Sequence, residues 1–134
     1  MDLKTPFNLV GDLVSRYTPA RPKSVHLVVT YKCNSRCRFC GIWRKYKTNP
    51  QLQTKEMSAD EIVRFFSDPL LRGAYVCITG GEPFLRNDLF SIVEGLLSNG
   101  HGLSINTNGL LPGLVSELGK TGDTEKLHVG ISID

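Results

Sequence analysis

The sequence lacks the features of a membrane or exported protein. It has no apolar run of about 18 residues, which a membrane-spanning helix requires. Its start, Met1–Lys4 followed by Thr5-Pro6, has neither the basic region nor the apolar core of a secretory signal. It also contains no internal repeat and no low-complexity tract. These absences favour a globular, cytoplasmic protein that does not associate with a membrane.

A strong excess of one charge sign is also lacking. The chain has 16 basic and 13 acidic residues, which give a formal net charge of +3. That balance is too small to predict nucleic-acid binding. A solvated loop face is the ordinary interpretation of the local basic excess before residue 56, and attraction of an anionic substrate or a reductase partner is the alternative. The excess is densest around Arg36, Arg38, Arg44, Lys45 and Lys47.

What is present is typical of one folded domain. The 134 residues are 40% hydrophobic and 22% charged, as in soluble globular proteins, and the length suits a single core. A weak amphipathic stretch closed by Thr18-Pro19 and Arg21-Pro22 predicts a helical or capping segment over residues 1–23. The core domain is expected over residues 24–134.

Short β-rich runs alternate with amphipathic helical stretches, a pattern that predicts βαβ units and a parallel sheet. Strands are expected at residues 24–30, 74–79, 102–107 and 127–133. Helices are expected at residues 59–67, after a Ser58/Glu61 capping box, from residue 89 to a left-handed cap at Gly100, and from residue 111 to Gly119. A parallel sheet that ends on its fourth strand leaves an apolar edge open, so the domain is expected to be incomplete at its C-terminal end.

Three of the four cysteines fall within eight residues, just after the first predicted strand. Cys33, Cys37 and Cys40 have C-x-x-x-C-x-x-C spacing, and without a secretory signal this spacing favours metal binding over disulfides. Three thiolates on a loop suit an iron–sulfur cubane that keeps one iron without a protein ligand, which is open for chemistry.

Structural zinc is the alternative for the cysteine loop, although no second cysteine doublet is present. Its fourth ligand would be one of His26, His101, His128 and Cys77. Cys77 lies inside the apolar run Tyr75–Thr79, where a cysteine is expected to behave as a small buried hydrophobe.

A second motif, Thr79-Gly80-Gly81-Glu82-Pro83, follows the second predicted strand. Two glycines at a strand end permit close backbone approach, and Glu82 supplies a negative charge that suits an ammonium group. With Phe39 just before the third cysteine, the two motifs resemble those of the radical S-adenosylmethionine (radical SAM) superfamily. Within it, Cys33–Cys37 and Gly41-Ile42-Trp43 look like the branch of molybdenum-cofactor biosynthesis proteins and peptide-modifying maturases.

The resemblance implies a partial parallel (βα)6 barrel, of which this α/β chain holds the N-terminal part with about four of six strands. It implies an enzyme that binds a 4Fe-4S cluster and S-adenosylmethionine and cleaves the latter to methionine and a 5'-deoxyadenosyl radical. That radical abstracts hydrogen from a substrate that is a peptide, a nucleotide or a small metabolite. A reductase or flavodoxin-type protein would supply the electron.

By the same resemblance, Cys33, Cys37 and Cys40 carry the cluster. The residues expected to contact the cofactor are Phe39, Gly80, Gly81, Glu82, Pro83, Asn106, Asn108 and Ser132, and Asp134 lies near them at the end of the fourth strand. All of these follow the carboxyl ends of predicted strands, where parallel sheets assemble active sites. Two rivals stay open: a zinc-binding interaction module, and a truncated chain that binds the cofactor but cannot turn over substrate.

Overall fold

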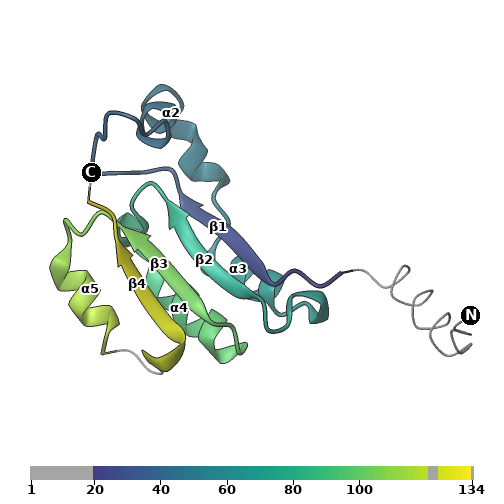
Figure 1. The fold of residues 1–134 in the computed structure, drawn as a ribbon. Coiled ribbons are helices and arrows are strands. Elements are labelled where there is room, and N and C mark those ends of the chain that lie inside the picture. The colour runs from purple at the N-terminus through teal and green to yellow at the C-terminus, as the bar shows by residue number, and fades with distance from the viewer. Residues whose placement is uncertain (1–19, 121–123, 134) are drawn as a thin grey trace, which may run out of the picture.

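The computed structural model describes residues 20–120 and 124–133, and its main element is a four-stranded parallel sheet (Figure 1). The strands are β1 (Ser24–Thr30), β2 (Tyr75–Gly80), β3 (Leu103–Thr107) and β4 (Leu127–Ile131). They lie in the order β1-β2-β3-β4, so each strand pairs with the next one along the chain. The predicted parallel α/β sheet is confirmed, and each strand begins and ends within two residues of its expected range.

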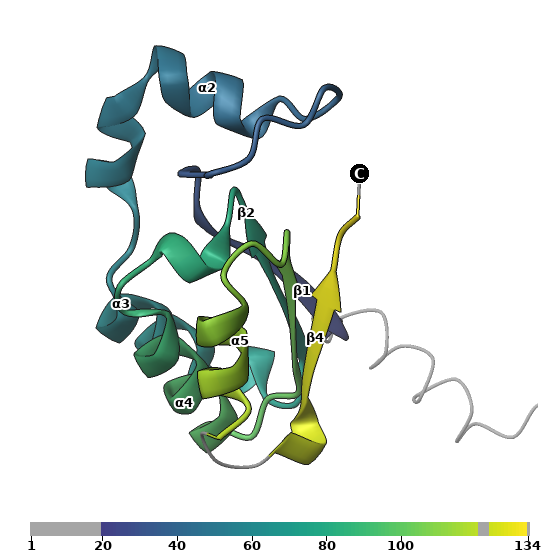
Figure 2. The ribbon, with the colours of Figure 1, turned by 90° about the vertical axis from the view of Figure 1, so that its left-hand side faces the viewer.

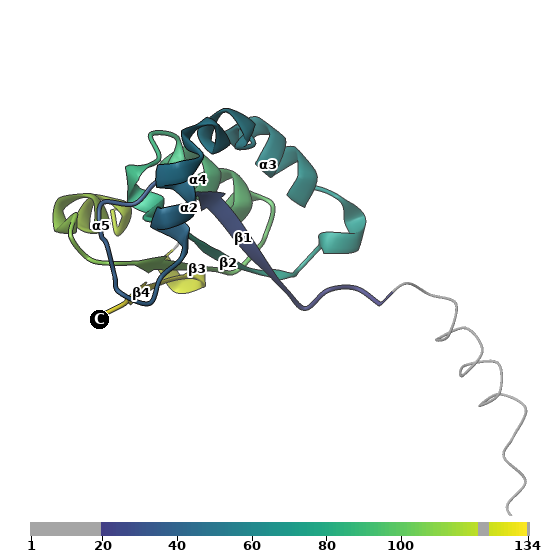
Figure 3. The ribbon, with the colours of Figure 1, turned by 90° about the horizontal axis from the view of Figure 1, so that it is seen from above.

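Helices lie in the segments between the strands. They are α2 (Ile42–Thr48), α3 (Ala59–Phe66), α4 (Leu89–Ser98) and α5 (Pro112–Leu118). Figures 2 and 3 show α3, α4 and α5 on the same face of the sheet, and α2 beyond the carboxyl ends of the strands. None of the helices in the described residues is long and apolar enough to span a membrane.

Local sequence signals explain where the helices begin and end. The Ser58 side chain accepts a hydrogen bond from the Glu61 N–H, and the Glu61 side chain accepts one from the Ser58 N–H, which forms the predicted capping box of α3. These bonds to Ser58 lower the pKa of Glu61. Gly100 has φ +85°, the left-handed conformation expected after α4. Of the helical or capping segment predicted at residues 1–23, residues 1–19 lie outside the described residues.

The hydrophobic core lies between the sheet and its three covering helices. Alternate strand residues are fully buried there, namely Val76, Ile78, Leu103 and Ile105. They pack against fully buried side chains of the helices, including Ile62, Phe66, Leu89, Ile92, Leu96 and Leu118. Since side chains alternate along a strand, the residues between these positions lie on the opposite face.

The opposite face carries a row of polar side chains across the middle of the sheet. His26, Cys77, Ser104 and His128 are register partners across the four strands, and each is exposed or only half-buried. Val76 and Ile78 point into the hydrophobic core, so Cys77 between them lies on the opposite face and is only half-buried. The expectation that Cys77 belongs to the hydrophobic core is therefore wrong. A parallel sheet with helices on one face and a polar row on the other is the arrangement of a partial barrel wall.

Candidate functional site

Most of the buried polar side chains of the described residues gather at the carboxyl ends of the strands. Thr30, Glu82 and Thr107 are 3%, 0% and 2% exposed and lie at or just beyond the carboxyl ends of β1, β2 and β3. Burial of polar groups costs free energy unless each finds a partner, so these residues define a built polar network. Active sites of parallel α/β sheets form at these carboxyl ends.

Glu82 is the centre of this network. Its Oε1 accepts hydrogen bonds from the Thr107 hydroxyl at 2.8 Å and from the Phe84 N–H at 3.1 Å. Its Oε2 accepts a hydrogen bond from the backbone N–H of Asn108 at 2.8 Å. Pro83 follows, buried, at the start of a short 3-10 turn. The Glu82 carboxylate therefore ties the turn after β2 to the end of β3.

Asn108 continues the network to the cysteine loop. Its side-chain Nδ2 donates to Asn34 Oδ1 at 2.8 Å and to Ser35 Oγ at 2.9 Å. Its Oδ1 accepts from the backbone N–H of Leu110 at 3.0 Å. Residues from three segments that are distant in sequence are thus brought together at the carboxyl ends of β1, β2 and β3.

The two glycines of the second motif allow the turn after β2 to lie against the start of the cysteine loop. Gly80 has φ +141°, and a Cβ there would lie 2.3 Å from the carbonyl oxygen of Thr30. A Cβ on Gly81 would lie 2.1 Å from the carbonyl oxygen of Lys32. The backbone N–H groups of Gly81 and Glu82 donate to these same two oxygens, each at 2.8 Å. The expected close backbone approach is therefore made to the chain that leads into the cysteines.

Arg86 fixes the other side of the same turn. Its Nη1 donates to the carbonyl oxygen of Val29 at 2.7 Å, and its Nη2 donates to that of Met57. Its Nη2 also lies 2.9 Å from Asp88 Oδ2, which accepts from the Ala59 N–H as well. The Arg86 guanidinium hydrogen-bonded to Asp88 holds the pKa of that carboxyl below its ordinary range.

The three clustered cysteines lie on the loop between β1 and α2. All four cysteines are within the described residues, and none forms a disulfide. Cys37 and Cys40 line a pocket of about 490 Å³ together with Arg38 and Phe39, and Phe39 is 95% exposed. In the described residues no three His, Cys, Asp or Glu side chains lie close enough to hold one metal ion. The donor set of three partly exposed thiols on one loop nevertheless fits an iron–sulfur cluster by its chemistry.

The residues weighed as a fourth zinc ligand do not lie with these thiols. His101 is fully buried, and its two ring nitrogens each lie 2.9 Å from a backbone carbonyl oxygen, those of Ala74 and Phe66. The other three belong to the polar row across the middle of the sheet, namely His26, Cys77 and His128.

The remaining predicted contact residues are less closely joined to the network. Asn106 is exposed, and its Oδ1 would lie 3.0 Å from a Cβ placed on its register partner Gly130. Ser132 is exposed, and its N–H donates to the Thr107 carbonyl oxygen at 2.8 Å. Asp134 lies outside the described residues.

Five residues of the site were not identified from the sequence, namely Thr30, Asn34, Ser35, Glu56 and Arg86. Asn34 and Ser35 lie inside the cysteine motif, and Arg86 closely follows the second motif, so proximity to the motifs was the available signal. Glu56 carries no such signal, yet its Oε1 accepts from the Thr30 hydroxyl at 2.8 Å and supports the end of β1.

Comparison with known proteins agrees with this arrangement. The family model described as the radical SAM superfamily matches residues 27–134. The chain therefore belongs to the radical SAM superfamily, a class of enzymes whose cofactors are a 4Fe-4S cluster and S-adenosylmethionine and whose fold is a partial (βα) barrel. The expected fold class and superfamily are confirmed.

Individual relatives of the chain have more specific names than the superfamily. The chain is 37% identical over 114 residues to a probable GTP 3',8-cyclase of Methanococcus maripaludis strain C6, with 84% of this chain and 36% of the relative covered. It is 36% identical over 113 residues to the GTP 3',8-cyclase of Listeria monocytogenes serotype 4b, with 82% and 33% covered. It is 44% identical over 84 residues to a 7-carboxy-7-deazaguanine synthase of Hyperthermus butylicus, with 60% and 32% covered. The chain spans about a third of the length of these relatives.

Proposed function

We propose that this chain is the part of a radical SAM enzyme that binds a 4Fe-4S cluster through Cys33, Cys37 and Cys40 and binds S-adenosylmethionine beside it. The observation that carries the proposal is the hydrogen-bonded junction of the cysteine loop, the turn after β2 and the end of β3. When bound, these cofactors supply a one-electron cleavage that releases methionine and a 5'-deoxyadenosyl radical, which takes a hydrogen atom from the substrate.

The chain's own residues hold and orient the cofactors in this proposal. The three thiols bind three irons, and the exposed Phe39 ring packs against the organic cofactor beside the pocket that it lines. Gly80, Gly81 and Pro83 form the turn against which the cofactor is placed. Because both oxygens of the buried Glu82 carboxylate accept protein hydrogen bonds, Glu82 acts by shaping that turn and by its negative charge.

An external protein would supply the electron, and the surface around the cysteine loop suits an acidic donor. No acidic residue occurs between Asp12 and Glu56. The basic side chains of this stretch that flank the loop are exposed, namely Lys32, Arg36, Arg38, Arg44, Lys45 and Lys47. We propose that this basic face attracts an acidic one-electron donor of the reductase or flavodoxin type, with an association rate that falls as salt increases.

Among the three substrate classes, a nucleotide is favoured. Two of the relatives are GTP 3',8-cyclases by their names, and they match more than four-fifths of this chain. A basic face beside the pocket also suits a phosphorylated substrate. The proposal predicts that GTP increases deoxyadenosine formation in the reduced protein, whereas GTP without effect would favour a peptide or small-metabolite substrate.

The decisive experiment is anaerobic iron and sulfide analysis of the purified protein, with EPR spectra of the reduced state before and after addition of S-adenosylmethionine. A cubane signal that shifts on addition is expected. Zinc in place of iron would support the interaction-module alternative. A cluster that binds S-adenosylmethionine but forms no deoxyadenosine would identify a chain that binds cofactor without turnover.

Cys37→Ala is expected to abolish cluster-dependent cleavage of S-adenosylmethionine and to lower the iron content, because it removes one of three cluster ligands. Cys77→Ala is the matched control, because Cys77 lies in the middle of β2 and outside the cysteine loop. A Cys37→Ala protein with full iron content and full cleavage would contradict the assignment.

Glu82→Ala is expected to weaken the binding of S-adenosylmethionine while the cluster is retained. The substitution removes the acceptor for three hydrogen bonds at a fully buried position, so it also lowers the free energy of unfolding by roughly 2–3 kcal/mol. Binding is measured by titration and stability by denaturant unfolding. If the variant instead loses iron and keeps its affinity, the role assigned to Glu82 is wrong.

A further inference from the structure

We infer that Asn108 is a positioning residue that braces the cysteine loop, and that it acts through Ser35 on the sulfur of Cys33. This inference rests on the proposed function and adds to it a residue that sets the environment of the cluster. It gives Asn108 a role different from direct contact with the organic cofactor.

The hydrogen bonds of Asn108 carry the inference. Both donors of its side-chain amide are used within the protein, one toward Asn34 Oδ1 at 2.8 Å and the other toward Ser35 Oγ at 2.9 Å. Its Oδ1 accepts from the Leu110 N–H at 3.0 Å. Because an asparagine amide has two N–H donors, no donor remains for a bound ligand.

Asn108 is itself held in place by its backbone. Its N–H donates to the buried Glu82 carboxylate at 2.8 Å, and its neighbour Thr107 donates its hydroxyl to the same carboxylate. The anchor is therefore rigid, whereas Asn34 and Ser35 lie on a loop without regular secondary structure. A fixed amide that holds two consecutive loop residues restricts the loop at the position between the first two cysteines.

The restriction reaches a sulfur atom. The backbone N–H of Ser35 donates to Cys33 Sγ at 3.3 Å, while the Ser35 hydroxyl oxygen accepts from Asn108. Hydrogen bonds to cysteine sulfurs are among the features that set the reduction potential of iron–sulfur clusters, since they stabilise the more negative, reduced state. Asn108 would therefore keep the potential of the cluster higher than a free loop would.

The first test needs no cluster. Amide hydrogen exchange of residues 33–37 is measured in the cluster-free protein for Asn108→Ala, Ser35→Ala, the double variant and Asn87→Ala, a control in the exposed turn before α4. We expect about tenfold faster exchange in Asn108→Ala, which loses both bonds to the loop, and a smaller increase in Ser35→Ala, which keeps the bond to Asn34. The double variant should exchange no faster than Asn108→Ala. Unchanged exchange in Asn108→Ala, or faster exchange in the double variant than in Asn108→Ala, would overturn the brace.

The second test uses the reconstituted protein: the midpoint potential is measured without S-adenosylmethionine, and S-adenosylmethionine binding is then measured by a separate titration. A lower midpoint potential is expected for Asn108→Ala and Ser35→Ala, and an unchanged potential is expected for Asn87→Ala. An unchanged potential together with weaker S-adenosylmethionine binding would overturn the inference in favour of direct cofactor contact. If the wild-type protein binds no cluster, the proposed function fails, and the exchange measurement alone still decides whether Asn108 holds the loop.

Discussion

Glu82 and Arg86 hold the same turn from two sides. Glu82 joins it to the end of β3, and Arg86 joins it to the end of β1 and to the segment before α3. Charged side chains are seldom buried without several partners, so each of these residues fixes more than one neighbour. The second motif is therefore as much a structural junction as a contact surface for a ligand.

The pairing of Arg86 with Asp88 predicts an acid-sensitive contribution to stability. The hydrogen bond to Arg86 lowers the pKa of Asp88 in the folded protein, so the contribution is present above the ordinary Asp value of 3.8 and is lost as the pH falls through the folded-state pKa. Denaturant unfolding should show a lower free energy of unfolding for Asp88→Asn at neutral pH. The difference from wild type should shrink well below pH 3.8; a difference that is constant with pH would contradict this prediction.

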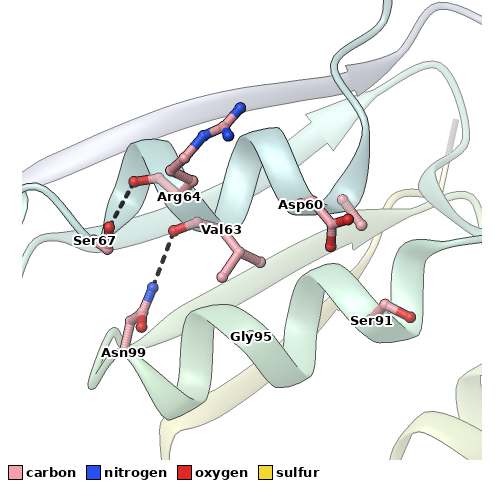
Figure 4. Close-up of a pocket in the computed structure, with 8 residues that line it drawn as sticks. Asp60, Val63, Arg64, Ser67, Ser91, Gly95 and Asn99 are labelled. Carbon is pink, nitrogen blue, oxygen red and sulfur yellow. Dashed lines mark hydrogen bonds between the residues drawn. The ribbon is translucent and has the colours of Figure 1, made fainter.

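At the scale of elements, α3 and α4 pack through a position that only glycine fits. A Cβ on Gly95 of α4 would lie 2.3 Å from Cγ2 of Val63 in α3. Figure 4 shows the Val63 side chain directed toward Gly95, within a groove of about 430 Å³ whose polar lining includes Asp60 and Ser91. The Val63 carbonyl also accepts from Asn99 Nδ2 at 3.1 Å, which ties the two helices at a second point.

Gly95→Ala is therefore expected to destabilise the protein, although alanine favours helix more than glycine does. Overpacking costs about 1–3 kcal/mol, which exceeds the propensity gain of about 1 kcal/mol in most of that range. Val63→Ala in the same chain should recover stability by removing the methyl groups that clash. Thermal and denaturant unfolding of the two single variants and the double variant measure this, and a Gly95→Ala protein more stable than wild type would contradict it.

The elements that the sequence predicted well are those with a repeated local signal. The strands follow β-branched alternation, and α3 follows its capping box. Helix α2 was not predicted, because it has only seven residues and none of them is buried. Cys77 was misassigned because an apolar run in the sequence does not say which face of the sheet each residue occupies. The hydrogen bonds that join Asn34, Glu82 and Asn108 were not predictable, since the bonded residues are separated by 26 and 74 positions.

Across the whole molecule, the two faces of the sheet are covered differently, and the β4 edge carries exposed apolar side chains. One face is covered by α3, α4 and α5 (Figures 2 and 3). The other face carries the polar row from His26 to His128, whose members are exposed or half-buried. The β4 edge has apolar side chains that the described residues leave exposed, with Val129, Ile131 and Ile133 at 38%, 59% and 93%. The apolar edge expected from the sequence is thus present in the structure.

This edge predicts self-association of the 134-residue chain. A strand edge with unpaired backbone groups and apolar side chains is a template for pairing, and proteins commonly block such edges with lysine. Sedimentation velocity over a range of concentrations should show association in the wild type that Ile131→Lys reduces. Leu70→Lys is the matched control, because Leu70 is 50% exposed in the short turn Pro69–Leu71 and outside the sheet. An equal effect of both substitutions would mean that net charge, rather than the β4 edge, governs association.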